Sequence, residues 1–171
     1  MSLASTLKTT VGYLGTLITR YTPLDLSRPG IEGIFNHLRI DDRLVTSGQP
    51  TEEQLVLVRD AGIRHVINLA PHAAENALPD EAATLAALNI EYTHIPVDFA
   101  RPTDADFTRF CDEMARLSNV PLLVHCAANM RVSAFVFRYR RDVLGEPAER
   151  AAEDLHRVWE PFGVWKDFVA R

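Results

Sequence analysis

One stretch of the chain combines residue types suited to nucleophilic chemistry on an anion. An apolar run leads into His125-Cys126, a short loop follows, and an amphipathic pattern begins at about Arg131. This order predicts a strand, a tight turn that carries a cysteine, and a helix. In such a turn successive backbone N–H groups form an anion-binding nest, and the helix adds its positive N-terminal end. The predicted anion-binding residues of the loop are Ala127, Ala128, Asn129 and Met130.

The same loop favours the reactive form of Cys126. Positive charge from the helix end and from Arg131 stabilises a thiolate, which is the nucleophilic form of cysteine. His125 either contributes to that stabilisation or orients the loop through hydrogen bonds to backbone. Ser133, at the start of the helix, either hydrogen-bonds the sulfur or has a structural role. The sequence leaves both pairs of alternatives open.

The order of these residues resembles the signature of the cysteine-dependent protein tyrosine and dual-specificity phosphatases. That signature has five residues between Cys and Arg, whereas this chain has four between Cys126 and Arg131. The glycine of the family loop is missing, and we expect Asn129 to adopt the left-handed conformation in its place. The shorter spacing turns Arg131 by roughly 100° around the helix relative to the longer one. The hydroxyl residue, Ser133, stands two positions after Arg131.

A broader resemblance covers about residues 44–139. It is to a bacterial phosphatase branch allied to the beta-lactamase hydrolase-like proteins. The segments that carry it, in the order of that branch, are Thr46-Ser47-Gly48-Gln49-Pro50-Thr51, Ala61-Gly62-Ile63, Val66-Ile67-Asn68-Leu69, Ile95-Pro96-Val97-Asp98 and the cysteine loop. The resemblance implies a single-domain α/β fold of the tyrosine phosphatase kind, with a mostly parallel sheet and helices on both faces. The short loop by itself also resembles that of the rhodanese-like sulfurtransferases.

Asp98 is the predicted general acid. It lies 28 residues before Cys126, after a predicted strand, which resembles the placement of the general acid in dual-specificity phosphatases. Asp104 and Asp106 are alternatives, but both follow Thr103 in the first turn of a predicted helix. Carboxylates at that position are explained by the helix dipole.

Three functions fit these residues. The first is hydrolysis of a phosphomonoester, on a phosphorylated small molecule or a phosphoprotein, through a phosphocysteine at Cys126 with Asp98 as acid and base. The second is sulfur transfer through a persulfide on Cys126, which needs no general acid. The third is phosphate binding without turnover. None of the three needs a cofactor.

Composition narrows the classes of partner. A chain of 171 residues with a net charge of −5 is expected to form one globular domain and lacks the basic face of nucleic-acid-binding proteins. Two cysteines do not make a disulfide framework, and a reactive Cys126 favours a reducing, cytoplasmic compartment. The histidines and acids lack the paired spacing of zinc ligands, so we expect no metal site. The sequence indicates nothing about the oligomeric state.

The N-terminal segment is expected to be separate from the catalytic domain. We divide the chain into a helical arm with a linker, residues 1–30, and a phosphatase-like domain, residues 31–171. Pro23, Pro29 and Gly30 mark the linker. The predicted helix of the arm is weakly amphipathic, through Leu3, Leu7, Leu14 and Leu17. It is too interrupted by glycine and threonine to span a membrane, and we do not expect it to associate with one.

Strands and helices alternate along the predicted domain. This alternation predicts a largely parallel sheet, in which ligands bind at the carboxyl ends of the strands. The ends at Asn68, Asp98 and Cys126 are therefore expected to face one site. The predicted strands are a hairpin over 34–45 and single strands over 63–69, 90–97 and 121–126. The predicted helices run from Thr51 to Gly62, over 80–88, from Thr103 onward, over 131–145 and over 147–159, and a last short helix holds Phe162, Trp165 and Phe168.

Overall fold

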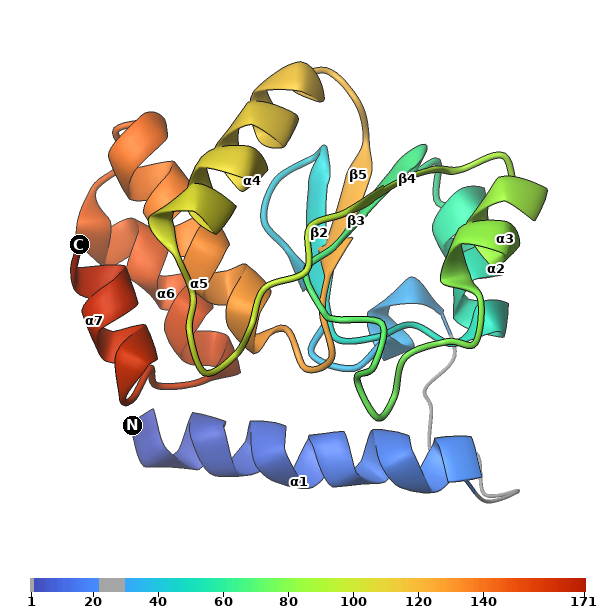
Figure 1. Cartoon of the computed structure of the whole chain (residues 1–171), viewed down its shortest axis with the longest axis horizontal. Helices are drawn as coiled ribbons and strands as arrows, with labels where there is room; N and C mark the ends of the chain where they lie inside the picture. The colour runs from blue at the N-terminus through green and yellow to red at the C-terminus, as the bar shows by residue number, and fades with distance from the viewer. Residues whose placement is uncertain (1, 22–29) are drawn as a thin grey trace.

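The protein, in a computed structural model, is described for residues 2–21 and 30–171. In these ranges five strands form one sheet in the order β1-β2-β5-β3-β4, with helices on both faces (Figure 1). The strands are β1 (Leu38–Arg39), β2 (Leu44–Ser47), β3 (His65–Asn68), β4 (Glu91–His94) and β5 (Leu122–His125). The predicted α/β class with a mostly parallel sheet is confirmed.

The helices follow the predicted order. They are α1 (Ser2–Tyr21), α2 (Glu52–Asp60), α3 (Glu81–Ala87), α4 (Asp104–Arg116), α5 (Met130–Arg138), α6 (Ala148–Val158) and α7 (Val164–Ala170), with a 3-10 turn, η1 (Ile31–Gly33), and a π-helical turn, η2 (Tyr139–Val143). The helix predicted for the N-terminal arm is thus present as α1. The predicted linker residues Pro23 and Pro29 lie outside the described residues.

The sheet brings three strand ends to one edge. Strands β2, β5, β3 and β4 are parallel neighbours, and only the short β1 pairs antiparallel, with β2. In this register Asn68 lies opposite His125 on β5 and opposite His94 on β4. Asn68 and the cysteine strand therefore end at the same edge of the sheet.

Each central strand is buried on both faces, as expected in a parallel sheet. Ile67 and Val124 belong to a core with α4, α5, α6 and α7, whereas Val66 and Leu123 point into a second core with α2 and α3. Figure 1 shows these two sets of helices on opposite sides of the sheet. The rigid centre of this sandwich carries the cysteine loop at the end of β5.

Local signals in the sequence set several boundaries correctly. Thr51 and Gln54 form the predicted capping box at the start of α2, with each side chain bonded to the other residue's backbone N–H. Gly62, just after that helix, has a φ of 87°, which a residue with a side chain rarely adopts. Thr103 caps α4 as predicted and accepts a hydrogen bond from the Asp106 amide at 3.1 Å.

Two predictions about the C-terminal helices are wrong. In the helix predicted over 131–145, the spacing of Val143 from Val136 and Tyr139 predicts that it shares their buried face, but its exposed fraction is 53%. The reason is η2, in which the Leu144 amide bonds to the Tyr139 carbonyl at 3.1 Å, so the wider turn rotates Val143 outward. Phe162 lies before α7 rather than within it and is exposed, because the helix starts only after Gly163.

Helix α1 crosses the edge of the sheet where the parallel strands end (Figure 1). Thr6 Oγ1 accepts a hydrogen bond from the Glu160 amide at 2.9 Å, and the buried Thr9 donates to the Val158 carbonyl. These bonds attach α1 to the segment around the end of α6. Across the described parts of the chain, no helix combines the length and apolar character that spanning a bilayer requires.

Candidate active site

The backbone of the cysteine loop is held through its carbonyl groups. The Ala127 carbonyl accepts from Asn76 Nδ2 at 2.9 Å and from the Gln49 amide at 3.3 Å, and the Ala128 carbonyl accepts from Asn36 Nδ2 at 3.1 Å. A trans peptide places its N–H opposite its carbonyl. The N–H group that follows the Ala127 carbonyl therefore points away from Asn76 and Gln49.

The loop ends in the first turn of α5. Asn129 has a φ of 65°, so the predicted left-handed conformation is confirmed. The first bond of the helix runs from the Ser133 amide to the Asn129 carbonyl at 2.9 Å. The amides of residues 130–132 thus lie in the turn that lacks intrahelical acceptors, where the helix end is positive. This helix end lies at the position where the sequence predicts an anion-binding loop.

The segment Thr46–Thr51 packs directly against the loop. Asn129 Nδ2 donates to Thr46 Oγ1 at 3.1 Å and to the Asn36 carbonyl at 2.8 Å. A Cβ on Gly48 would lie 2.9 Å from Phe35 Cδ1 and 3.1 Å from the Ala127 carbonyl oxygen. Only glycine fits between these groups without a shift. The motif therefore serves to bring a second piece of backbone against the cysteine loop.

A buried acid beside His125 was not singled out in the sequence. Glu81 Oε1 lies 3.0 Å from His125 Nε2, and both side chains are almost completely buried. The angle at the imidazole falls outside ordinary hydrogen-bond geometry, so the contact is mainly electrostatic. Glu81 also accepts from Gln49 Nε2 at 2.8 Å, from Asn68 Nδ2 at 2.7 Å and from the Tyr92 hydroxyl at 3.1 Å.

This network keeps Glu81 ionised. Burial alone would raise the pKa of its carboxyl, but the electrostatic interaction with His125 and the hydrogen bonds from Gln49 and Asn68 outweigh burial and lower the pKa to about 2. A buried carboxylate with four polar neighbours can fix the ring of His125 without itself exchanging protons near neutral pH. His125 is thereby contacted by a buried carboxylate from the first turn of α3.

Arg131 has a guanidinium that is only partly engaged. Its Cζ lies 5.1 Å from the centroid of the Phe99 ring, a cation–π contact. Its buried Nε has no hydrogen-bond partner among the described residues. Since a buried guanidinium N–H normally finds an acceptor, this group is suited to an anion at the loop. Cys126, at the other end of the loop, is fully buried.

Asp98 lies on the exposed loop between β4 and α4. Its carboxylate accepts from the Ala100 amide at 2.9 Å, a local turn that leaves most of the side chain accessible. The next residue is Phe99, whose ring contacts Arg131 and whose carbonyl accepts from Trp165 Nε1 at 2.8 Å. The structure therefore brings the segment of Asp98 to the guanidinium of Arg131.

The other candidate residues have structural partners. Ser133 Oγ donates to the Met130 carbonyl at 3.1 Å and accepts from Trp159 Nε1 at 3.2 Å, which matches the structural alternative for this hydroxyl. Asp104 is exposed and pairs with Arg138 at 3.0 Å. Asp106 caps its own helix by accepting from the Thr103 amide at 3.1 Å. No group of three or more potential metal ligands occurs in the described ranges.

Tyr13 on α1 is a second residue near the site that the sequence did not indicate. Burial and the carboxylate of Glu75, 3.5 Å from the hydroxyl, raise the pKa of Tyr13, while the guanidinium of Arg131 lowers it. The phenol is therefore within electrostatic range of Arg131. Neither Tyr13 nor Glu81 belongs to a recognisable motif. Their only sequence signal was a polar side chain within a helical pattern.

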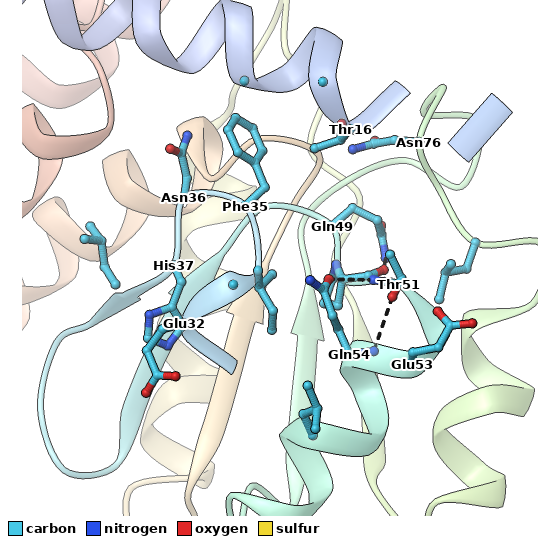
Figure 2. Close-up of a pocket in the computed structure, with 18 of the residues that line it drawn as sticks. Thr16, Glu32, Phe35, Asn36, His37, Gln49, Thr51, Glu53, Gln54 and Asn76 are labelled. Atoms are coloured by element: carbon cyan, nitrogen blue, oxygen red, sulfur yellow. Dashed lines mark hydrogen bonds between the residues drawn. The ribbon is translucent and has the colours of Figure 1, made fainter. Parts of the chain in front are cut away.

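A large hollow of about 1320 Å³ lies behind the loop, between α1 and the start of α2. Figure 2 shows Phe35 pointing toward α1, with Asn36, Gln49 and Asn76 around the hollow. These are residues that brace the carbonyls of the loop or lie beside it. Neither Cys126 nor Arg131 is part of the lining of this hollow.

Comparisons with known proteins agree with this fold. A protein from Shewanella putrefaciens CN-32, described as "Putative phosphatase (DUF442)", is 30% identical with a TM-score of 0.75, over 82% of this chain and 92% of that one. Tk-PTP, at 18% identity and a TM-score of 0.68 over 79% of this chain and 94% of that one, shares the fold. The fold and the cysteine loop define a phosphatase of the tyrosine and dual-specificity kind.

The family model described as "DSP-PTPase phosphatase fused to NAD+ Kinase" matches residues 16–160. The chain belongs to this family. A beta-lactamase hydrolase-like protein of Agrobacterium fabrum is 30% identical over 97 residues, which are 55% of this chain and 22% of that protein. The chain thus spans about a fifth of the length of the curated relatives that it matches.

Proposed function

We propose that the protein hydrolyses phosphomonoesters in two steps through a phosphocysteine. In the first step the Cys126 thiolate attacks phosphorus, the bond from phosphorus to the ester oxygen breaks, and Asp98 donates its proton to the leaving oxygen. In the second step Asp98 accepts a proton from water, which attacks phosphorus. The S–P bond then breaks, so phosphate leaves and the thiolate returns.

The observation that carries this proposal is the buried Nε of Arg131, which has no partner among the described residues and lies at the end of a loop whose carbonyls are braced from outside. Three equatorial phosphate oxygens need several donors and at least one positive charge as charge shifts in the transition state. The loop amides and Arg131 can supply both. The bracing by Gln49, Asn36 and Asn76 supports a loop of fixed shape in spite of its four-residue spacing.

Glu81 and His125 have a positioning role in this proposal. The carboxylate fixes the imidazole at the end of β5, and His125 precedes the nucleophile directly. A displaced imidazole would shift the backbone of Cys126. Since small misplacements of reacting groups slow a reaction strongly, the pair contributes to rate through geometry.

The proposed substrate class is an aryl phosphate, such as phosphotyrosine, or another phosphomonoester of a small molecule or a protein. TpbA of P. aeruginosa, which shares the fold at 22% identity and a TM-score of 0.59, has a structure described as a complex with pTyr. In this chain the Phe99 ring lies against the Arg131 guanidinium, where it can contact an aromatic substrate. The free thiols of Cys111 and Cys126 support a reducing compartment such as the cytoplasm.

The test is hydrolysis of para-nitrophenyl phosphate by the wild type, by Cys126→Ser and by Cys111→Ser. Cys111 is the matched control, because it is half-buried on α4 and burial raises the pKa of its thiol to about 11. We expect activity to fall to background in Cys126→Ser and to stay within about twofold of wild type in Cys111→Ser. Equal activity of wild type and Cys126→Ser would refute the proposal.

Sulfur transfer from thiosulfate to cyanide, measured on the same preparations, separates the persulfide alternative. If sulfur transfer depends on Cys126 and no phosphate is released, the function is sulfur transfer rather than hydrolysis. Binding of phosphate without either activity would leave the non-catalytic alternative.

A further inference from the structure

Helix α1 has an apolar stripe that faces solvent. Leu7, Val11, Leu14 and Ile18 are exposed at 65%, 59%, 54% and 43% of their surface. Their spacings of four, three and four residues place them on one side of the helix. Scattered exposed apolar residues are ordinary in a protein surface, but a row of four along one helix is a sign of an interaction surface.

The opposite side of α1 contacts the rest of the chain through small and polar residues. Thr9 is buried and accepts from Asn36 Nδ2 at 3.0 Å, and Thr6 accepts from the Glu160 amide. A Cβ on Gly12 would lie 2.3 Å from Phe35 Cε2, so the helix backbone lies directly against that ring. The helix therefore presents its polar side to its own domain and its apolar side outward, the reverse of an ordinary surface helix.

The stripe has the 3.5-residue repeat of a coiled coil. Val11 and Ile18 take the first core position of the heptad, and Leu7 and Leu14 take the second. β-branched residues at the first position with leucine at the second favour a parallel, two-stranded coiled coil. We propose that the stripe is a dimer interface, in which α1 pairs in parallel with α1 of a second copy of this chain.

The positions beside the stripe and the shape of the molecule permit this pairing. Thr10 and Gly15 flank the core and would face each other across the dimer without charge, and Lys8 is the one charged residue at a flanking position between residues 7 and 18. Each domain lies on the side of α1 away from the stripe, so two domains would extend in opposite directions (Figure 1).

The expected dimer is weak. Burying a fully exposed aliphatic side chain removes roughly 60–120 Å² of apolar surface, and these side chains are 43–65% exposed, so eight of them give roughly 250–550 Å². That total is below the roughly 1,200 Å² of stable interfaces, so the association is expected to depend on concentration. A helix that lies in a membrane surface usually has a broad apolar face with several basic residues on the polar face, whereas α1 has a narrow stripe and only Lys8 and Arg20.

The first test is sedimentation of the full chain over a concentration series. We expect the wild type to shift from monomer to dimer as concentration rises into the range of roughly 10–200 µM. Leu14→Lys should remain a monomer over that range. Leu57→Lys is the matched control, since Leu57 is an exposed leucine within α2, and it should dimerise like the wild type. Circular dichroism checks that both variants are folded.

A second test reads the orientation of the helices. In a parallel, in-register dimer Val11 meets its own counterpart, so Val11→Cys should form a disulfide-linked dimer on mild oxidation, well beyond the wild-type background from Cys111 and Cys126. A wild type that stays monomeric throughout, or a Leu14→Lys variant that dimerises unchanged, would overturn the proposal. The proposal would also be overturned if the wild type never dimerised but bound vesicles of anionic lipid, and if Leu14→Lys abolished that binding.

Discussion

The loop that carries Cys126 and the loop that carries Asp98 are held in different ways. The cysteine loop receives hydrogen bonds from Asn36, Gln49 and Asn76, which come from three separate segments. The Asp98 carboxylate has one local partner, the Ala100 amide, and is exposed. The difference teaches that the fold preorganises the loop of the proposed nucleophile, whereas the proposed acid is an exposed side chain held through its neighbours Val97 and Phe99.

Changes at Asp98 should therefore affect chemistry and leave stability unchanged. We expect Asp98→Asn to slow turnover of aryl phosphates by roughly 10²–10⁴. The loss should be larger for alkyl phosphates, because a poorer leaving group depends more on protonation. Steady-state kinetics on both substrate types, with thermal unfolding of the same samples, measure the two effects.

Asp104→Asn is the control for that change. Asp104 is another exposed carboxylate near the same loop, but it is paired with Arg138. Its replacement should leave the rate within about threefold of wild type. If Asp104→Asn shows the larger loss, the assignment of the acid to Asp98 is wrong.

Changes beneath the cysteine loop should affect stability and rate together. In Glu81→Gln an amide NH₂ would replace one carboxylate oxygen and would face side-chain donors, and the electrostatic contact of the carboxylate with His125 would be lost. Breaking a buried pair in this way costs about 3 kcal/mol. We expect the free energy of unfolding to fall by about that amount, measured in urea, and the rate to fall roughly tenfold or more.

The same pair predicts a pH dependence. The folded-state pKa of Glu81, about 2, lies below its value in the unfolded chain, near 4.5. The unfolded state therefore binds more protons between these values, and the contribution of Glu81 to stability is complete above about pH 4.5. It is lost as pH falls toward 2. The difference in unfolding free energy between wild type and Glu81→Gln should shrink over that window, and Glu153→Gln, at an exposed position of α6, should show no such change.

The smallest effect is expected at Gly48. In Gly48→Ala the added Cβ must displace the Phe35 ring or the Ala127 carbonyl, which costs about 1–2 kcal/mol. Gly15→Ala is the matched control, because nothing lies within 4 Å of the added Cβ and the residue is within a helix. Thermal melts should show a lower midpoint for Gly48→Ala and an unchanged or higher one for Gly15→Ala. The reverse order would mean that the close approach of Gly48 to the loop is unimportant.

Local signals in the sequence were sufficient for much of the fold. The capping residues Thr51 and Thr103 and the left-handed Asn129 depend on interactions within a few residues, and all three were predicted correctly. Val143 was misplaced because a π-helical turn changes the period of a helix without a mark in the composition.

The site was predictable only where residues are close in sequence. The loop from Cys126 to Arg131 is a single motif, so its geometry followed from the chain itself. Glu81 begins a helix, and an acid in a first turn is common, so its contact with His125 became visible only in three dimensions. Likewise, the pattern Leu3, Leu7, Leu14, Leu17 suggested an amphipathic α1, but the exposed stripe runs through Val11 and Ile18.

The most direct test of the central claim is to trap the covalent intermediate. Asp98→Asn, mixed with para-nitrophenyl phosphate and quenched in acid, should accumulate a phosphoenzyme, because the base for the second step is missing. We predict that mass spectrometry will find one added phosphoryl group, on the peptide that contains Cys126. A variant that turns over substrate with no phosphoryl group on Cys126 at any time point would contradict the account.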